Sequence, residues 1–320
     1  MDKQGFTAYL ESRGLRARTI ITHLKYVGQF FDRVQKEDVQ VTKPDVLKFL
    51  EYLKNDRQLQ NNCRSYYLAS LNHYFTWLRR EGLIAVNPCM LLRIRGTHKR
   101  KLYYKIYTRE ELDQLFDNYY QSFIRSYDDS HYVNEAQRQY SALGRERNIV
   151  MLSILFCQGT ATSEIATIEL GDLDLIKATL KIRGAKRAND RTLPLQATQV
   201  GLFMHYLQNI RPQILKYQTS ESNRLFLPLP ETSKKETDGG GMLRYSFGLL
   251  TKQMKSIDKQ FLNVLQLRAS VISYWIKTQG LRKAQYLAGH RYVSSTENFL
   301  PNNLDDLTDY INKLHPFNLE

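Results

Sequence analysis

The sequence predicts a mainly α-helical protein of two domains, the second of which carries a small β-hairpin sheet. The length of 320 residues is enough for two ordinary domains. Hydrophobic residues make up 42% of the chain and aromatic residues 12%, enough to build cores. Apolar residues recur at helical spacing through most of the chain, and one stretch alternates as paired strands do. We expect a helical domain over 1–98, a basic linker over 99–107 and a larger domain over 108–320.

Four helices are expected in the first domain. The segment 3–14 has Phe6 and Leu10 at helical spacing and stops at Gly14. The segment 16–35 places six apolar residues on one broad face: Ile20, Ile21, Leu24, Val27, Phe30 and Phe31. The segment 42–56 begins with a Thr cap followed by a Pro in the first turn. The segment 61–82 carries an aromatic stripe that we interpret as core and ends in Arg79-Arg80 before Gly82.

The second domain is predicted to start with a helix whose capping box joins Thr108 to Glu111. A polar loop is expected at 127–137, and a buried helix then ends at Gly159. The stretch "KATLKIRGAKRANDRTLPL" alternates like two strands around a polar turn. Further helices are expected at 196–217, 242–258, 261–279 and 281–288, with a short amphipathic helix over 302–315.

Positive charge is concentrated in the first third of the chain. Of the net charge of +14, residues 1–105 carry 20 Lys/Arg against 9 Asp/Glu, which gives +11, and the rest carries 26 against 23, which gives +3. This imbalance points to a polyanion, and we expect a nucleic acid, although a merely solvated basic surface is the alternative. The residues that we expect to contact DNA are Arg18, Lys25, Arg64, Arg79, Arg93, Arg95, Lys99, Arg100 and Lys101.

Several classes of protein are disfavoured. No apolar run approaches the ~18 residues of a membrane span, and the first residues lack the apolar stretch of a secretory signal. Cys63, Cys89 and Cys157 are widely spaced and are expected to be reduced structural thiols. No cluster of His and Cys indicates a metal, so no metal and no cofactor is expected. A cytoplasmic, nucleoid-associated protein with no membrane partner is the expectation.

A few polar residues stand in patterns that suit phosphoryl transfer. Such a reaction needs fixed cations beside the phosphate oxygens and an acid for the leaving oxygen. Lys186 lies in the hairpin turn, and Arg268 lies at the start of an apolar helix, where burying it unpaired would be costly. His290 opens the motif "GHxxxSST", and Phe299 follows nine residues later. The alternative for each is a solvated or structural side chain.

Taken together, these motifs resemble those of the tyrosine recombinases, or phage-type integrases. The segments "FTAYLESRGLRARTIITHLKYVGQFF" and "SLNHYFTWLRREGLIAVNP" are similar to the core-binding domain of that family. The remainder is similar to its catalytic domain, with Lys186, Arg268 and His290 at the positions of catalytic residues. The resemblance implies a SAM-like helical domain followed by an α-rich catalytic domain. It also implies cleavage and rejoining of DNA strands through a 3′-phosphotyrosine, without metal or nucleotide.

The family resemblance further implies partners. We expect a homo-oligomer, dimer to tetramer, on double-stranded DNA, with an accessory DNA-bending protein as a further partner. The segment 302–315 would pack into a neighbouring protomer, and packing on its own domain is the equal alternative.

Three positions depart from the family pattern. Ala161 stands where the first arginine belongs, Leu265 where a histidine belongs, and Phe299 where the nucleophilic tyrosine belongs. An arginine from elsewhere could take the first role, and the candidates are Arg145, Arg147 and Arg183. Phenylalanine has no oxygen to attack a phosphate. We therefore predict a recombinase that is inactive as written, with a non-catalytic DNA-binding regulator or accessory protein on the same fold as the alternative. An RNA-binding or scaffold protein would leave Lys186, Arg268 and His290 unexplained.

Overall fold

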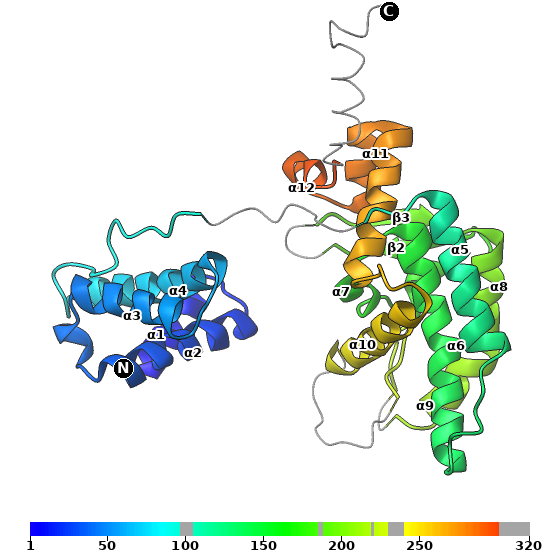
Figure 1. Cartoon of the computed structure of the whole chain (residues 1–320), viewed down its shortest axis with the longest axis horizontal. Helices are drawn as coiled ribbons and strands as arrows, with labels where there is room; N and C mark the ends of the chain where they lie inside the picture. The colour runs from blue at the N-terminus through cyan, green and yellow to red at the C-terminus, as the bar shows by residue number, and fades with distance from the viewer. Residues whose placement is uncertain (97–104, 185–187, 219–220, 230–239, 301–320) are drawn as a thin grey trace, which may run out of the picture. The chain divides into compact units, whose positions relative to one another are not determined.

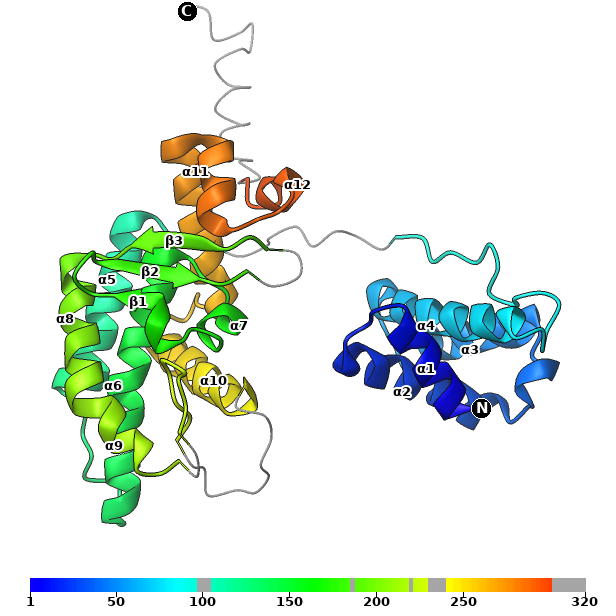
Figure 2. The same ribbon diagram turned by 180° about the vertical axis from the view of Figure 1, so that it is seen from behind.

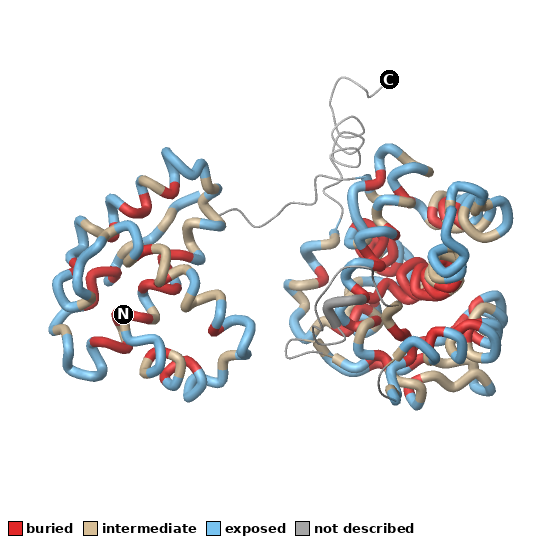
Figure 3. The backbone as a smooth tube through the Cα atoms, turned by 90° about the horizontal axis from the view of Figure 1, so that it is seen from below, coloured by how far each residue is buried: buried red, intermediate tan, exposed pale blue. Residues whose placement is uncertain are grey.

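The computed structural model describes residues 1–96, 105–184, 188–218, 221–229 and 240–300, with the backbone alone for 240–242. The chain divides into two compact units, Met1–Lys101 and Leu102–Glu320. Buried segments lie in the interior of each unit, and exposed segments surround them (Figure 3). Most of the predicted linker over 99–107, and the predicted helix over 302–315, fall outside the described residues.

The described part of the first unit folds into four α-helices, as the sequence predicted. They are α1 (Lys3–Ser12), α2 (Ala17–Val34), α3 (Lys43–Asn55) and α4 (Asn61–Arg80), with a 3₁₀ turn, η1 (Asp38–Gln40), before α3 (Figure 1). The predicted start of α3 is confirmed, because Thr42 and Asp45 form a capping box with a Pro in the first turn.

The aromatic stripes of the first unit form its core. Phe6, Phe30 and Tyr74 have no exposed surface, and the rings of Phe6 and Tyr74 meet edge to face with 5.0 Å between their centroids. The prediction of core rather than base-stacking side chains therefore holds for these rings. Ile21, which was expected on the apolar face of α2, is instead 65% exposed. A broad helical face has edges, and Ile21 lies at one of them.

The second unit is built around a long buried helix. In chain order its first elements are α5 (Arg109–Tyr120), the π-helical turn η2 (Gln121–Arg125), α6 (Glu135–Gln158), α7 (Thr162–Ile165) and the 3₁₀ turn η3 (Leu170–Asp172). The second half of α6 is buried on all sides, which explains its continuous apolar sequence. The predicted loop at 127–137 was too long, since α6 begins at Glu135, where Asn134 caps it by accepting from Ala136 N at 2.8 Å.

A three-stranded antiparallel sheet lies beside these helices. Its strands are β1 (Leu173–Asp174), β2 (Thr179–Ile182) and β3 (Arg191–Pro194), in the order β1-β2-β3 (Figure 2). The predicted hairpin is β2 and β3, in which Leu180 pairs with Leu193, and β1 is an addition that the sequence did not indicate. A two-residue strand is too short for an alternating pattern to reveal it.

Helices complete the second unit. After the sheet come α8 (Ala197–His205), the π-helical turn η4 (Tyr206–Ile210), α9 (Arg211–Leu215), α10 (Gly240–Ile257), α11 (Val264–Ala288) and α12 (Val293–Glu297). Gly280, with φ of 80°, interrupts α11 at the boundary that the sequence predicted between two helices. Gly159 and Gly289, both with positive φ, end α6 and α11 and turn the chain into the same region of the unit.

Candidate active site

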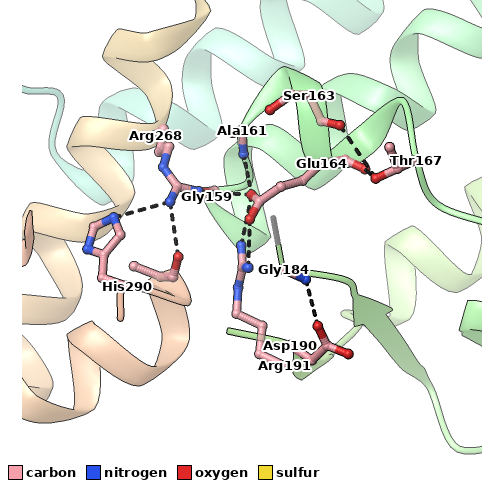
Figure 4. A network of polar contacts seen from close by, with 11 residues as sticks. Gly159, Ala161, Ser163, Glu164, Thr167, Gly184, Asp190, Arg191, Arg268 and His290 are labelled. Atoms are coloured by element: carbon pink, nitrogen blue, oxygen red, sulfur yellow. Dashed lines mark hydrogen bonds and ion pairs between the residues drawn. The ribbon is translucent and has the colours of Figure 1, made fainter. Parts of the chain in front are cut away.

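Segments that lie far apart in the sequence meet in one cluster of polar side chains (Figure 4). Glu164 belongs to α7, Arg191 begins β3, Arg268 lies near the start of α11, and His290 follows the end of α11. The backbone of Gly159 joins them, because its carbonyl accepts a hydrogen bond from Arg268. The end of α6, the sheet and both ends of α11 are thereby fixed to one another.

Glu164 is the centre of this cluster. Its carboxylate is 6% exposed and accepts from both terminal nitrogens of Arg191, at 2.8 and 3.0 Å. Its Oε2 also accepts from Arg268 Nη1 at 3.2 Å and from Ala161 N at 2.7 Å. Burial opposes ionisation of this carboxyl, but the hydrogen bonds and charges of the two guanidinium groups outweigh it and lower the pKa of Glu164. Glu164 is therefore a carboxylate shared by two arginines.

Arg268 is 8% exposed and uses its donors on four partners. Nη1 donates to Gly159 O at 2.6 Å and to Glu164, and Nη2 donates to Ala288 O at 3.0 Å. Nη2 also lies 3.2 Å from His290 Nε2. Its burial is therefore compensated by hydrogen bonds, and the guanidinium is held in one orientation next to the histidine.

His290 is a neutral imidazole with a defined tautomer. Because an arginine only donates, the contact with Arg268 makes Nε2 an acceptor, and Nδ1 then donates to Thr296 Oγ1 at 2.9 Å. Burial, followed by the charges of Arg268 and Arg191, lowers the pKa of His290 to about 4. At neutral pH this side chain carries no charge.

Phe299 lies against His290. The two rings are stacked, with 5.5 Å between their centroids and 14° between their planes. The backbone carbonyl of Phe299 accepts from Ser273 Oγ of α11 at 2.8 Å, which holds the segment after α12 in place. The side chain at the predicted nucleophile position is thus in the cluster, and it carries no oxygen.

Lys186 lies outside the described residues, but the strand end that follows it is docked on the cluster. Ala188 forms an isolated β-bridge with His290, and Asn189 N donates to Gly289 O at 2.9 Å. Gly289 suits this place, since its φ is 68° and an added Cβ atom would clash with Arg191 Nη1 and press on the backbone oxygen of Asn189. Ala188 and Asn189, which follow Lys186 in the sequence, therefore lie immediately beside His290 and Gly289.

The structure shows where two of the residues that depart from the family pattern lie. Ala161 is the N-cap residue of α7, and its backbone NH is bonded to Glu164. Leu265 lies in the first turn of α11 and is 44% exposed. Neither side chain can donate a hydrogen bond to a phosphate.

The arginine that joins Arg268 is Arg191, which the sequence analysis did not select. Of the three candidates named there, Arg145 pairs with Asp129, Arg147 donates to Leu227 O and Ser246 Oγ, and Arg183 pairs with Glu169 and Asp172. A signal was present in the sequence. In "RTLPL" the apolar Leu193 and Leu195 share the parity of Arg191, so that an inward-facing strand also turns Arg191 inward.

The predicted DNA-contacting residues of the first unit differ in how exposed their side chains are. Most of those described are exposed, and these are Arg18, Lys25, Arg79, Arg93 and Arg95. Arg64 is half-buried and donates to Leu50 O at 3.2 Å and to Asn61 Oδ1 at 3.0 Å. Lys99, Arg100 and Lys101 fall outside the described residues.

Among the residues that the structure describes, every helix is too short or too polar to span a lipid bilayer. Among the same residues, no three or more His, Cys, Asp and Glu side chains gather in a way that could hold a metal ion.

Known proteins are similar to both units. The phage integrase N-terminal SAM-like domain matches residues 3–84. The tyrosine recombinase XerC of Oceanobacillus iheyensis is 28% identical over 284 residues, which cover 86% of this chain and 81% of the relative.

Solved structures share the fold at low identity. The XerH site-specific recombinase bound to a palindromic difH substrate, in a post-cleavage complex, aligns with a TM-score of 0.66 and 16% identity over 96% of this chain and 84% of that one. A lambda integrase tetramer bound to a Holliday junction aligns with a TM-score of 0.59 and 15% identity over 92% of this chain and 74% of that one. The predicted fold class is confirmed.

Proposed function

We propose that this chain, a relative of the tyrosine recombinases as its sequence predicted, binds double-stranded DNA as an oligomer and holds a DNA phosphate without cutting the strand. The relative from Oceanobacillus iheyensis is a tyrosine recombinase by name, and the XerH site-specific recombinase of similar fold is bound to its difH substrate. The proposed reaction class is therefore strand cleavage and rejoining through a phosphotyrosine, with the covalent step blocked by Phe299.

One observation carries the proposal: the ring of Phe299 is stacked on His290, which in turn contacts Arg268. The guanidinium supplies positive charge, and the imidazole supplies a group that can accept or donate a proton. Both would lie beside a phosphate oxygen that becomes more negative during the reaction. A tyrosine in place of Phe299 would bring its phenolic oxygen to this region. Phenylalanine keeps the ring and removes the attacking atom, so the site would bind but not react.

The remaining roles follow from this assignment. Residues 1–98 and the basic linker over 99–107 would contact the DNA backbone, and residues 108–320 would hold the phosphate. Lys186 would be the acid for the leaving oxygen. The tetramer and the DNA of the lambda integrase structure support an oligomer on DNA, and an accessory DNA-bending protein is a further expected partner. Binding to chromosomal DNA would place the protein on the nucleoid.

A second function is favoured by Ala161 and Leu265. Position 161 lacks the arginine and position 265 lacks the histidine that the family resemblance leads one to expect. A protein that no longer cuts DNA would not need these two side chains. The alternative function is a DNA-binding regulator or accessory protein that uses the recombinase fold only for recognition.

Covalent capture separates these functions. Duplexes that bind the protein are selected from a random DNA pool and offered to the natural protein and to Phe299→Tyr, and adducts that resist SDS are counted. Leu300→Tyr is the matched control, because Leu300 is the neighbouring residue and is 47% exposed. The expected result is adducts with Phe299→Tyr alone.

Each outcome has a definite meaning. Adducts that form with Phe299→Tyr and disappear when Arg268→Met is added to it mean a competent site that lacks only its nucleophile. Specific duplex binding without adducts in any variant supports the regulator. Adducts with the natural protein would contradict the proposed block at Phe299, and an absence of any preferred duplex would contradict both functions.

A further inference from the structure

The cluster raises the question of which residue provides the charge that is missing at position 161. A phosphate in transfer accumulates negative charge on several oxygens, and one guanidinium covers only part of it. Ala161 provides only a backbone NH, which is committed to Glu164 Oε2 at 2.7 Å. Any second cation of the site has to come from another element.

Arg191 reaches the same carboxylate from the sheet. It is 3% exposed, it forms two hydrogen bonds with Glu164, and its Nη1 lies so close to Gly289 that a Cβ atom there would be 2.4 Å away. Gly289 immediately precedes His290, so the guanidinium lies against the backbone next to the histidine, and Figure 4 shows it bonded to Glu164. Its Nε is buried and has no hydrogen-bond partner within the described part of the chain.

The charges of this cluster do not cancel. Arg191 and Arg268 carry one positive charge each, Glu164 carries one negative charge, and His290 is neutral. Burial is the main cause of the lowered pKa of His290 and of Arg268, and the charge of Arg191 adds to both shifts. One buried positive charge is therefore left without a counter-ion among these four side chains, and an anion beside Arg268 and His290 would balance it.

We propose that Arg191 takes over from β3 the electrostatic role of the arginine that is missing at position 161. The proposal rests on the proposed function, in that a phosphate occupies the site beside Arg268 and His290. Arg191 has no exposed side-chain surface and does not touch that phosphate. It is a positioning residue: it holds Glu164, which holds Arg268, and it adds the second positive charge.

The test is a cycle of four full-length proteins: the natural chain, Arg191→Met, Ala161→Arg and the double variant. Inorganic phosphate is titrated against chloride at equal ionic strength, and binding is followed by the NMR signals of the His290 ring. Arg191→Met should weaken phosphate binding on the order of tenfold, because it removes a positive charge near the phosphate without removing a direct contact. It should also raise the pKa of His290, because a nearby positive charge has gone.

Ala161→Arg distinguishes charge from structure. It should restore most of the phosphate binding in the Arg191→Met protein and change the natural protein less, because there the charge is already present. The matched control is Arg183→Met, which removes an arginine that pairs with Glu169 and Asp172 outside the cluster and should leave phosphate binding unchanged.

Definite results would overturn the inference. These are unchanged phosphate binding in a folded Arg191→Met, or an equal effect of Ala161→Arg in both backgrounds. If Arg191→Met does not fold, Arg191→Lys keeps the charge but loses the paired hydrogen bonds to Glu164. Ala161→Arg should then improve the phosphate binding of Arg191→Lys no more than that of the natural protein, and a larger improvement counts against the charge role. A natural protein that ignores phosphate would contradict the phosphate site of the proposed function itself, whereas the other results concern Arg191 alone.

Discussion

The arginines proposed for function in the two units differ in burial. In the first unit Arg18, Arg79, Arg93 and Arg95 are exposed, whereas in the second unit the side chains of Arg191 and Arg268 are buried around one carboxylate. Exposed charges act over the whole surface and are screened by salt. Buried charges keep one geometry because their hydrogen bonds fix them. The first arrangement suits affinity for a polyanion, and the second suits recognition of a single phosphate.

The largest effect is expected where the buried arrangement loses its carboxylate. Glu164→Gln leaves two buried guanidinium groups without a counter-charge, and it should reduce the free energy of unfolding of the second unit by about 3–5 kcal/mol. Urea denaturation measures this loss. The matched control is Glu169→Gln, which breaks a partly exposed pair with Arg183 and should cost only about 0.2–1 kcal/mol. Equal losses in the two variants would mean that Glu164 contributes no more than a surface pair.

The exposed arrangement is tested by the salt dependence of DNA binding. Replacing Arg79, Arg93 and Arg95 by Gln should weaken binding and reduce the slope of log affinity against log salt by about 0.9 for each lost phosphate contact. Fluorescence anisotropy with a duplex at several salt concentrations measures both. Arg125→Gln, at an exposed arginine of the second unit, is the control. An unchanged slope in the triple variant would remove these residues from the DNA interface.

Each unit contains histidines that make its folding stability depend on acid pH. Burial lowers the pKa of His23 and of His73, and it lowers the pKa of His290 to about 4. A histidine with a lowered pKa binds fewer protons in the folded state, so stability is lost as pH falls below about 6.5, the unfolded value. For His290 this loss extends down to about pH 4.

NMR titration of the imidazole signals checks these values. His290→Gln should remove part of the acid loss from the second unit, and His23→Gln should do the same for the first. A normal pKa for His290 would contradict its burial beside Arg268.

The smallest effect concerns a helix cap, whose contribution depends on the position of the threonine in its helix and not on the unit that contains it. In the second unit Thr108 Oγ1 accepts from Glu111 N at 3.2 Å, and Thr108→Ala should cost about 1 kcal/mol in urea denaturation. In the first unit Thr7 bonds back to Lys3 O inside α1 at 2.7 Å, and Thr7→Ala should be neutral or slightly stabilising. A loss at Thr7 as large as that at Thr108 would mean that the cap has no special value.

Local signals in the sequence determined the elements and their ends. The capping box of Thr108 and Glu111, the stop of α6 at Gly159 and the interruption at Gly280 depend on neighbours within a few residues, and all were predicted. The sequence also placed His290 and Phe299 in one motif, and the structure adds that the short helix α12 between them brings their rings together.

Tertiary structure alone decided the composition of the polar cluster. Glu164, Arg191 and Arg268 come from three elements, and their meeting depends on how the sheet docks on the ends of α6 and α11. From the sequence, Arg191 was one of many basic residues, and Arg145, Arg147 and Arg183 were equally plausible partners for a phosphate. Burial determines which arginine joins the cluster, because a guanidinium inside the protein is stable only beside an acceptor that the fold brings to it.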